Sequence, residues 1–181
     1  MKFFVETSRF ILREFRMEDA AGFLSLESDP EVLRYIGTPP VTDIKKIQEI
    51  ISHVRQQYQD NGIGRWVIVN KENEEIVGWT GLKLEKEIRP EKPYYDLGYR
   101  LKRKYWGQGI ATETALVSLD YGFKQLGLTE IFAGAHVDNI GSNRVLNKLG
   151  MELLEQFTFE EMLCNWYGMD ANRWNEQHPP S

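Results

Sequence analysis

The chain has 181 residues, of which 41% are hydrophobic and 27% are charged, and its formal net charge is −5. This length and composition predict one globular domain, residues 1–181, that buries a core of its own. Because the basic residues are scattered along an acidic chain, nucleic acid is not expected as a direct partner. The sequence contains no apolar run of the roughly 20 residues that a membrane span needs.

The first residues and the cysteine content bear on the compartment. Residues 1–6 carry charge too early for a secretory signal peptide. Cys164 is the only cysteine, so an intramolecular disulfide is impossible. Such cysteine usage fits a reducing compartment, and the sequence predicts a cytoplasmic protein without membrane contact.

The first predicted element is a strand over 9–15, where apolar and charged residues alternate. Two short helices are expected next, over 19–27 and 31–36. A longer helix then runs from a cap at Thr42 to about residue 59, because apolar residues recur there at helical spacing.

The rest of the chain also alternates strands and helices. Its predicted elements are, in order, hairpin strands at 66–70 and 76–84, a fourth strand at 94–101, a helix that stops at Gly127, a fifth strand at 130–137, a helix that stops at Gly150, and hairpin strands at 152–159 and 162–169. Within the fourth strand, Gly98 marks either a bulge or a packing accommodation. The tail after Ala171 is expected to be frayed. This order of elements predicts a mixed α/β fold.

Glycines crowd the entrance of the helix after the fourth strand, in the run Trp106, Gly107, Gln108, Gly109, Ile110, Ala111, Thr112 and Glu113. A helix N-terminus presents unpaired backbone N–H groups and partial positive charge, so it can hold a phosphate without a basic side chain. Gly107 and Gly109 let the backbone come close to such a ligand, and Ala111 keeps the first turn thin. Residues 106–112 are therefore a candidate pyrophosphate site. A tight bend that uses glycine only for its geometry is the alternative.

A second segment, from Asn139 to Met151, has the pattern of a short helix that begins at a cap and ends at Gly150. Either Asn139 or Ser142 supplies the cap. A serine or asparagine near a helix start is common for this reason alone, so the segment gains meaning only from its combination with the glycine run.

Together the two segments resemble the GNAT acetyltransferases. The acetyl-CoA loop of that family, Gln/Arg-x-x-Gly-x-Gly/Ala, corresponds here to Trp106-x-x-Gly109-x-Ala111, and its later Asn-x-x-Ser/Ala helix corresponds to Asn139-x-x-Ser142. The opening 9–13, Arg-Phe-Ile-Leu-Arg, is similar to the strand that begins the RimJ/RimL branch, the ribosomal-protein N-terminal acetyltransferases. The resemblance covers about residues 7–170, nearly the whole chain.

This resemblance implies a single GNAT domain with an α/β fold, in which a mixed central sheet is flanked by helices and splayed between its fourth and fifth strands. It implies acetyl-CoA as cosubstrate and no metal. The pantetheine arm would lie in the splay and pair with the fourth strand. The residues expected to face it on that strand are Leu97, Gly98, Tyr99, Arg100 and Leu101. Asn139 and Asn143 would hold the pantetheine or the loop, and a homodimer is compatible with this branch.

The resemblance also implies that Ser142 faces the departing sulfur. Many GNAT enzymes use a tyrosine four residues later, where this chain has Leu146, and a helix cap without chemistry is the alternative role for Ser142. Asp96 is the candidate general base, with a surface-facing strand aspartate as its alternative and His136 as the second candidate. Backbone N–H groups near residues 98–100 are expected to polarise the thioester carbonyl.

An amine is the expected acceptor. An N-terminal α-amine titrates near 8 and is partly neutral at cell pH, whereas a lysine side chain near 10.4 demands a stronger base. Because the sequence offers no compelling base, a protein or peptide N-terminus is the first choice. Acceptor recognition is expected at Tyr35, at the 37–40 turn, at Trp79 and in the 86–95 loop. The alternatives are a small polyamine or aminoglycoside acceptor and a CoA-binding module without catalysis.

Overall fold

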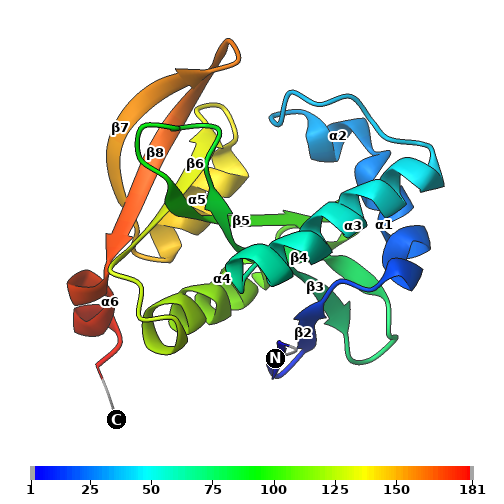
Figure 1. Ribbon diagram of the computed structural model, residues 1–181, viewed down its shortest axis with the longest axis horizontal. Helices are drawn as coiled ribbons and strands as arrows, with labels where there is room; N and C mark the ends of the chain where they lie inside the picture. Colours follow the sequence, from blue (N-terminus) through cyan, green and yellow to red (C-terminus); the bar gives the residue numbers. More distant parts are fainter. Residues whose placement is uncertain (1–2, 180–181) are drawn as a thin grey trace.

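The computed structural model of the chain describes residues 3–179 and contains one mixed sheet in the order β1-β2-β3-β4-β5-β6-β8-β7 (Figure 1). The strands are β1 (Phe4–Glu6), β2 (Phe10–Glu14), β3 (Arg65–Asn70), β4 (Ile76–Glu85), β5 (Tyr94–Leu101), β6 (Glu130–His136), β7 (Glu152–Phe159) and β8 (Met162–Asp170). The helices are α1 (Ala20–Glu27), α2 (Pro30–Leu33), α3 (Ile44–Asn61), α4 (Ile110–Asp120), α5 (Ile140–Lys148) and α6 (Ala171–Gln177). The predicted α/β class is confirmed.

The start of the sheet holds a strand that the sequence analysis lacks. β1 pairs antiparallel with β2 over three residues and lies at the edge of the sheet. Its central residue is half-buried and its ends are exposed. A strand this short carries too little alternation to be read from sequence.

Two helix starts differ from the prediction. The side chain of Asp43, rather than Thr42, caps α3 by accepting a 2.9 Å hydrogen bond from the backbone N–H of Lys45. Helix α2 begins at Pro30, one residue early, with Asp29 as its cap, and ends at Leu33. Proline is suited to the first helical position because its missing N–H has no intrahelical partner there.

The expectation of a frayed tail is wrong for the part of it that the structure describes up to residue 177. Residues 171–177 form α6, whose first turn is capped by the Asp170 side chain. Trp174 anchors the helix, since it is only 1% exposed and stacks on Phe123 at 5.6 Å between ring centroids. Residues 180–181 of the predicted tail lie outside the described part of the chain.

The predicted splay between the fourth and fifth expected strands is confirmed, and these strands are β5 and β6. β4 and β5 pair without interruption from Tyr94 to Leu101. β5 and β6 run parallel and share one pair, Asp96 with Phe132. Along 97–101, the edge of β5 that faces β6 therefore has no strand partner among residues 3–179. In Figure 1, β6, β7 and β8 lie to the left, α1, α2 and α3 to the right, and β5 runs between them.

Alternation along β5 gives the strand two different faces. Leu97, Tyr99 and Leu101 pack in the main core against α4, and we call this side the α4 face. Asp96 and Arg100 point to the opposite side, toward β3 and α1, and we call this side the α1 face. Side chains on the two faces are separated by the strand, so both can reach the same bound molecule only at the open edge of β5.

Gly98 is a packing accommodation, and the β4–β5 pairing shows no register shift there. A Cβ on this residue would lie 2.7 Å from Nη2 and 2.8 Å from Cζ of Arg65. The glycine therefore makes room for an arginine that crosses the α1 face.

Candidate active site

The glycine loop forms an open cradle at the start of α4. Gly107 and Gly109 have φ angles of +70° and +74°, which side chains rarely adopt. A Cβ on Gly107 would meet no described atom within 4 Å, and one on Gly109 would meet only Nη2 of Arg9 at 3.9 Å. Gly109 is the N-cap and gives α4 no side-chain cap, so the first-turn amides are free to bind an anion. The bend thus explains the glycines, and the empty space around them fits a pyrophosphate.

Arg9 ties this loop to the start of β2. Its Nε and Nη2 donate to Glu113 Oε2 at 2.8 and 2.6 Å, and its Nη1 and Nη2 donate to the carbonyl of Gln108, each at 3.1 Å. Beside it, Trp106 is 47% exposed, and its indole N–H donates to the carbonyl of Leu101. The loop is therefore fixed by its neighbours while its glycines stay accessible.

The start of α5 settles which residue is the cap. Asn139 Oδ1 accepts a 3.1 Å hydrogen bond from the backbone N–H of Ser142, so Asn139 is the N-cap. The Ser142 hydroxyl lies 3.0 Å from the hydroxyl of Tyr99, which also donates to the Ser142 carbonyl at 3.1 Å. Leu146, one turn later, is buried in the core.

Asn143 is fully engaged within the protein. Its Nδ2 donates to the carbonyls of His136 and Asn139, and its Oδ1 accepts from Asn165 and from the Tyr167 hydroxyl. These four bonds use the hydrogen-bonding capacity of the amide. They hold α5 against β6 and β8, and the predicted contact of Asn143 with the cofactor stays a prediction.

Asp96 is half-buried on the α1 face, with 15% of its side chain exposed, and forms an ion pair with Arg65. The same guanidinium donates to the Asp96 carbonyl at 2.7 Å and to the Gly81 carbonyl on β4. Burial raises the pKa of the Asp96 carboxyl, and the charge of Arg65 opposes that rise. Asp96 thus faces away from bulk solvent, unlike the surface aspartate of the alternative prediction.

A second ion pair lies beside the first. Arg100 Nη1 binds Glu27 Oε2 of α1 at 2.7 Å. Trp79 of β4 lies next to both arginines, with its ring centroid 5.1 Å from Cζ of Arg65 and 5.2 Å from Cζ of Arg100. The α1 face therefore combines two balanced ion pairs with one aromatic ring.

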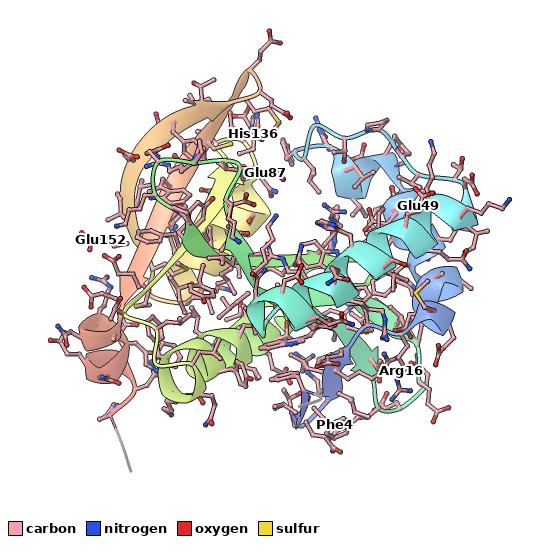
Figure 2. All side chains as sticks on the ribbon, in the orientation of Figure 1. Phe4, Arg16, Glu49, Glu87, His136 and Glu152 are labelled. Carbon is pink, nitrogen blue, oxygen red and sulfur yellow. The ribbon has the colours of Figure 1, made fainter. Side chains whose placement is uncertain are left out.

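His136 lies at the end of β6, on the side toward α2 (Figure 2). Its ring is 5.3 Å from that of Tyr35. Its Nδ1 accepts a 3.1 Å hydrogen bond from the backbone N–H of Asp138. In the neutral ring this hydrogen bond favours the tautomer that carries its proton on Nε2.

The 86–93 loop covers a pocket of about 240 Å³ close to the single β5–β6 pair. The lining residues are Arg89, Glu91, Lys92, Tyr94, Phe132 and Trp166. Arg89 lies over the Trp166 ring at 4.4 Å and pairs with a carboxylate of β7. The loop predicted to recognise the acceptor thus lies beside the splay.

Comparison with known proteins identifies the family to which this geometry belongs. The family described as acetyltransferase (GNAT) domain matches residues 9–152. The chain belongs to the GNAT acetyltransferase family. It is 33% identical over 146 residues to the uncharacterized N-acetyltransferase p20 of Bacillus licheniformis, covering 81% of this chain and 80% of that protein. It is 32% identical to the uncharacterized N-acetyltransferase YoaA of Bacillus subtilis, covering 86% and 88%.

The fold is also similar to that of a solved structure, the ribosomal-protein-S5-alanine acetyltransferase of Vibrio fischeri. The TM-score is 0.80 with 17% identity, over 95% of this chain and 98% of that one. At this identity the likeness concerns the fold. It extends over nearly the whole of the present chain rather than the loop alone.

GNAT acetyltransferases use acetyl-CoA, and the open cradle at Gly107 and Gly109 fits its pyrophosphate. Among residues 3–179, no group of three or more His, Cys, Asp or Glu side chains is placed to hold a metal ion. The same residues contain no helix long and apolar enough to cross a membrane.

The sequence does not indicate the partners of the candidate residues. These partners are Arg65 for Asp96, Glu27 for Arg100, and Tyr99 for Ser142. Each pair is more than 30 residues apart in sequence. No local pattern marks such pairs, because the packing of the folded sheet and its helices brings them together.

Proposed function

We propose that this GNAT acetyltransferase acetylates the α-amine of a protein or peptide N-terminus, as RimJ/RimL-type enzymes do. The observation that carries the proposal is the charge balance on the α1 face. Both Asp96 and Glu27 are bound to an arginine there. Paired carboxylates give little attraction to a polycation such as a polyamine.

The same pairing weakens any base on this face. An α-amine is partly neutral near pH 8, whereas a lysine side chain must first lose a proton that it holds to about pH 10.4. A site whose carboxylate is already bound to a guanidinium suits the first acceptor better than the second.

Acetyl-CoA, when bound, supplies a thioester whose carbonyl is open to direct attack by the amine in a ternary complex. Residues 106–112 would hold the pyrophosphate, and the open edge of β5 over 97–101 would pair with the pantetheine. Backbone N–H groups near 98–100 would polarise the carbonyl. Placing amine and thioester together supplies much of the rate increase, so no covalent intermediate on the protein is needed.

The two faces of β5 would then have different roles in the reaction. Asp96, on the α1 face, would accept the amine proton directly or through water. Ser142, beside the α4 face, would donate a hydrogen bond to the departing sulfur. The amine would enter from one side of the open edge and acetyl-CoA from the other.

The solved structure from Vibrio fischeri adds weaker support. The name of that protein gives a ribosomal protein as its substrate. The likeness of fold agrees with a protein N-terminus as acceptor and leaves other amines open, because one scaffold serves many acceptors.

The test is free-thiol release from acetyl-CoA with three matched acceptor pools and a blank without acceptor. The first pool holds peptides with free N-termini of ribosomal proteins and no lysine. The second holds the same peptides with blocked N-termini and one internal lysine. The third holds polyamines and aminoglycosides.

Release with the first pool alone is the expected result. Release with the second or third pool alone would overturn the α-amine proposal and fix the acceptor as a side-chain amine or a small polyamine. Binding of CoA without release from any pool would favour the CoA-binding module.

A further inference from the structure

Tyr99 reaches from β5 to the first turn of α5. Its hydroxyl lies 3.0 Å from Ser142 Oγ and donates to the Ser142 carbonyl at 3.1 Å. The two residues are 43 positions apart and lie on opposite sides of the splay. The ring packs against the main core, so the position of the hydroxyl is fixed.

The hydroxyl of Ser142 is available for a role other than helix capping. Asn139 occupies the N-cap position and accepts the backbone N–H of Ser142. Ser142 is therefore the third residue of the first turn, and its side chain faces Tyr99. A serine that only capped the helix would not need a phenol beside it.

Counting protons gives this pair two arrangements. The phenol has one proton, and Ser142 offers it two acceptors, the carbonyl and Oγ. When the phenol donates to the carbonyl, the serine hydroxyl donates back to the phenol oxygen. When the phenol donates to Oγ, the serine proton is free to point toward another acceptor.

We propose that Tyr99 is a positioning residue that turns the Ser142 hydroxyl toward the departing sulfur of CoA. The inference rests on the proposed role of Ser142 in the acetyl transfer. As the new C–N bond forms and the C–S bond breaks, the electron pair of that bond goes to sulfur. Ser142 donates a hydrogen bond to the thiolate and keeps its proton, while Tyr99 donates to Oγ.

The protons balance without any change at the two hydroxyls. The amine nitrogen loses one proton to the base or to water, and the thiolate takes one from water. A hydrogen bond that Oγ accepts makes its own O–H a stronger donor, because chained hydrogen bonds polarise one another. Stabilisation of the leaving thiolate follows from this chain.

Two further observations agree with this role. Burial raises the pKa of the Tyr99 phenol, so it stays protonated and remains a donor. Leu146 is buried in the core and offers no hydroxyl where many GNAT enzymes have a tyrosine. The phenol in this chain comes from β5 instead of from α5.

The test measures the pKa of the CoA thiol bound to the enzyme, by the ultraviolet absorbance of the thiolate, with CoA alone. The expected pKa in the parent enzyme is below that of free CoA. Tyr99→Phe and Ser142→Ala should each raise it by about one unit, a tenfold change in the ionisation constant. The double variant should raise it no further than Ser142→Ala does.

Tyr167→Phe is the matched control. It also removes a buried phenol hydroxyl that bonds to α5, at Asn143, and it leaves Ser142 untouched. This variant should leave the pKa of the bound thiol unchanged. Urea unfolding of each variant shows that it is folded at the pH range used.

Three results would overturn the proposal: a bound thiol in the parent enzyme with the pKa of free CoA, an equal rise with Tyr167→Phe, or an additive effect of Tyr99→Phe on Ser142→Ala. Because no acceptor amine enters this measurement, its outcome is independent of the acceptor pools. A negative result in the thiol pKa measurement would not affect the proposed α-amine acceptor. A negative result with the acceptor pools would not affect the proposed role of Tyr99.

Discussion

The glycine loop, which we propose for acetyl-CoA, and the α1 face of β5, which we propose for the acceptor amine, are built in different ways. The loop offers backbone groups from one short run, and Arg9 Nη2 is the single described atom that a Cβ on either of its two glycines would meet within 4 Å. The α1 face consists of side chains from α1, β3, β4 and β5, held in two ion pairs. A site made of backbone is readable from local sequence, whereas a site made of paired side chains exists only after the sheet forms.

The sharpest way to break the α1 face is Arg65→Met. Asp96, whose side chain is 15% exposed, would then lack its partner, which costs up to about 3 kcal/mol of folding free energy. Urea unfolding at neutral pH measures the loss. The control is Arg103→Met, which breaks the more exposed pair with Asp29 and should cost at most about 1 kcal/mol. Equal losses of folding free energy in the two variants would show that the ion pair on the α1 face stabilises the fold no more than a surface ion pair does.

Asp96→Asn tests whether the α1 face takes part in catalysis, as distinct from its contribution to folding stability. If Asp96 accepts the amine proton, kcat should fall by about a hundredfold or more. Activity of the parent enzyme should rise with pH as the carboxyl ionises, and the variant should lose this acid limb. The pH–rate profile on the responding peptide pool is the measurement. An acid limb at full height in the variant rules Asp96 out as the base.

Gly109→Val tests the backbone site. The φ of +74° is strained for a β-branched residue, and the new side chain would fill the cradle. Affinity for CoA should fall by about a hundredfold, as titration calorimetry can measure. Gly62→Val carries the same strain at the end of α3, where φ is +71°, and should weaken folding but not CoA binding. Unchanged affinity with Gly109→Val would remove the loop from the site.

Arg9→Ala gives the smallest expected effect. It frees the loop carbonyl of Gln108 and the side chain of Glu113 but leaves the cradle itself intact. Because Arg9 is partly exposed, the loss should be about 1 kcal/mol, or about a fivefold rise in KM for acetyl-CoA. Lys124→Ala breaks an exposed ion pair at the other end of the helical segment and should change nothing. Equal shifts in both variants would deny Arg9 any part in holding the loop.

Much of the fold could be predicted from local sequence patterns. The strand at 94–101 has the predicted bounds, and α4 continues into a π-helical turn over Tyr121–Gln125 that ends just before Gly127, where the helix was expected to stop. These elements have clear periodicity and glycine stops, which depend only on neighbouring residues. The combination of the two motifs also pointed to the family that the comparison shows.

The errors have one physical cause. The order of α6 depends on the burial of Trp174 against Phe123, about 50 residues earlier in the chain. The choice of Asp43 over Thr42 as a cap depends on which backbone turn precedes α3. The ion pair of Asp96 depends on strand register, and that of Arg100 depends on the packing of α1 against the sheet. In each case the decisive partner or geometry lies outside the window in which a sequence pattern is read.

The single β5–β6 pair divides the sheet into two halves, β1 to β5 and β6 to β8, that are joined at one point. Amide hydrogens on the open edge of β5 have no strand acceptor across the gap, so they should exchange with solvent faster than those bonded to β4. A pantetheine that pairs with this edge would protect them. Deuterium uptake over 97–101 should therefore be slower with CoA than without it. The small molecule would then act as the strand that the sheet lacks at this edge.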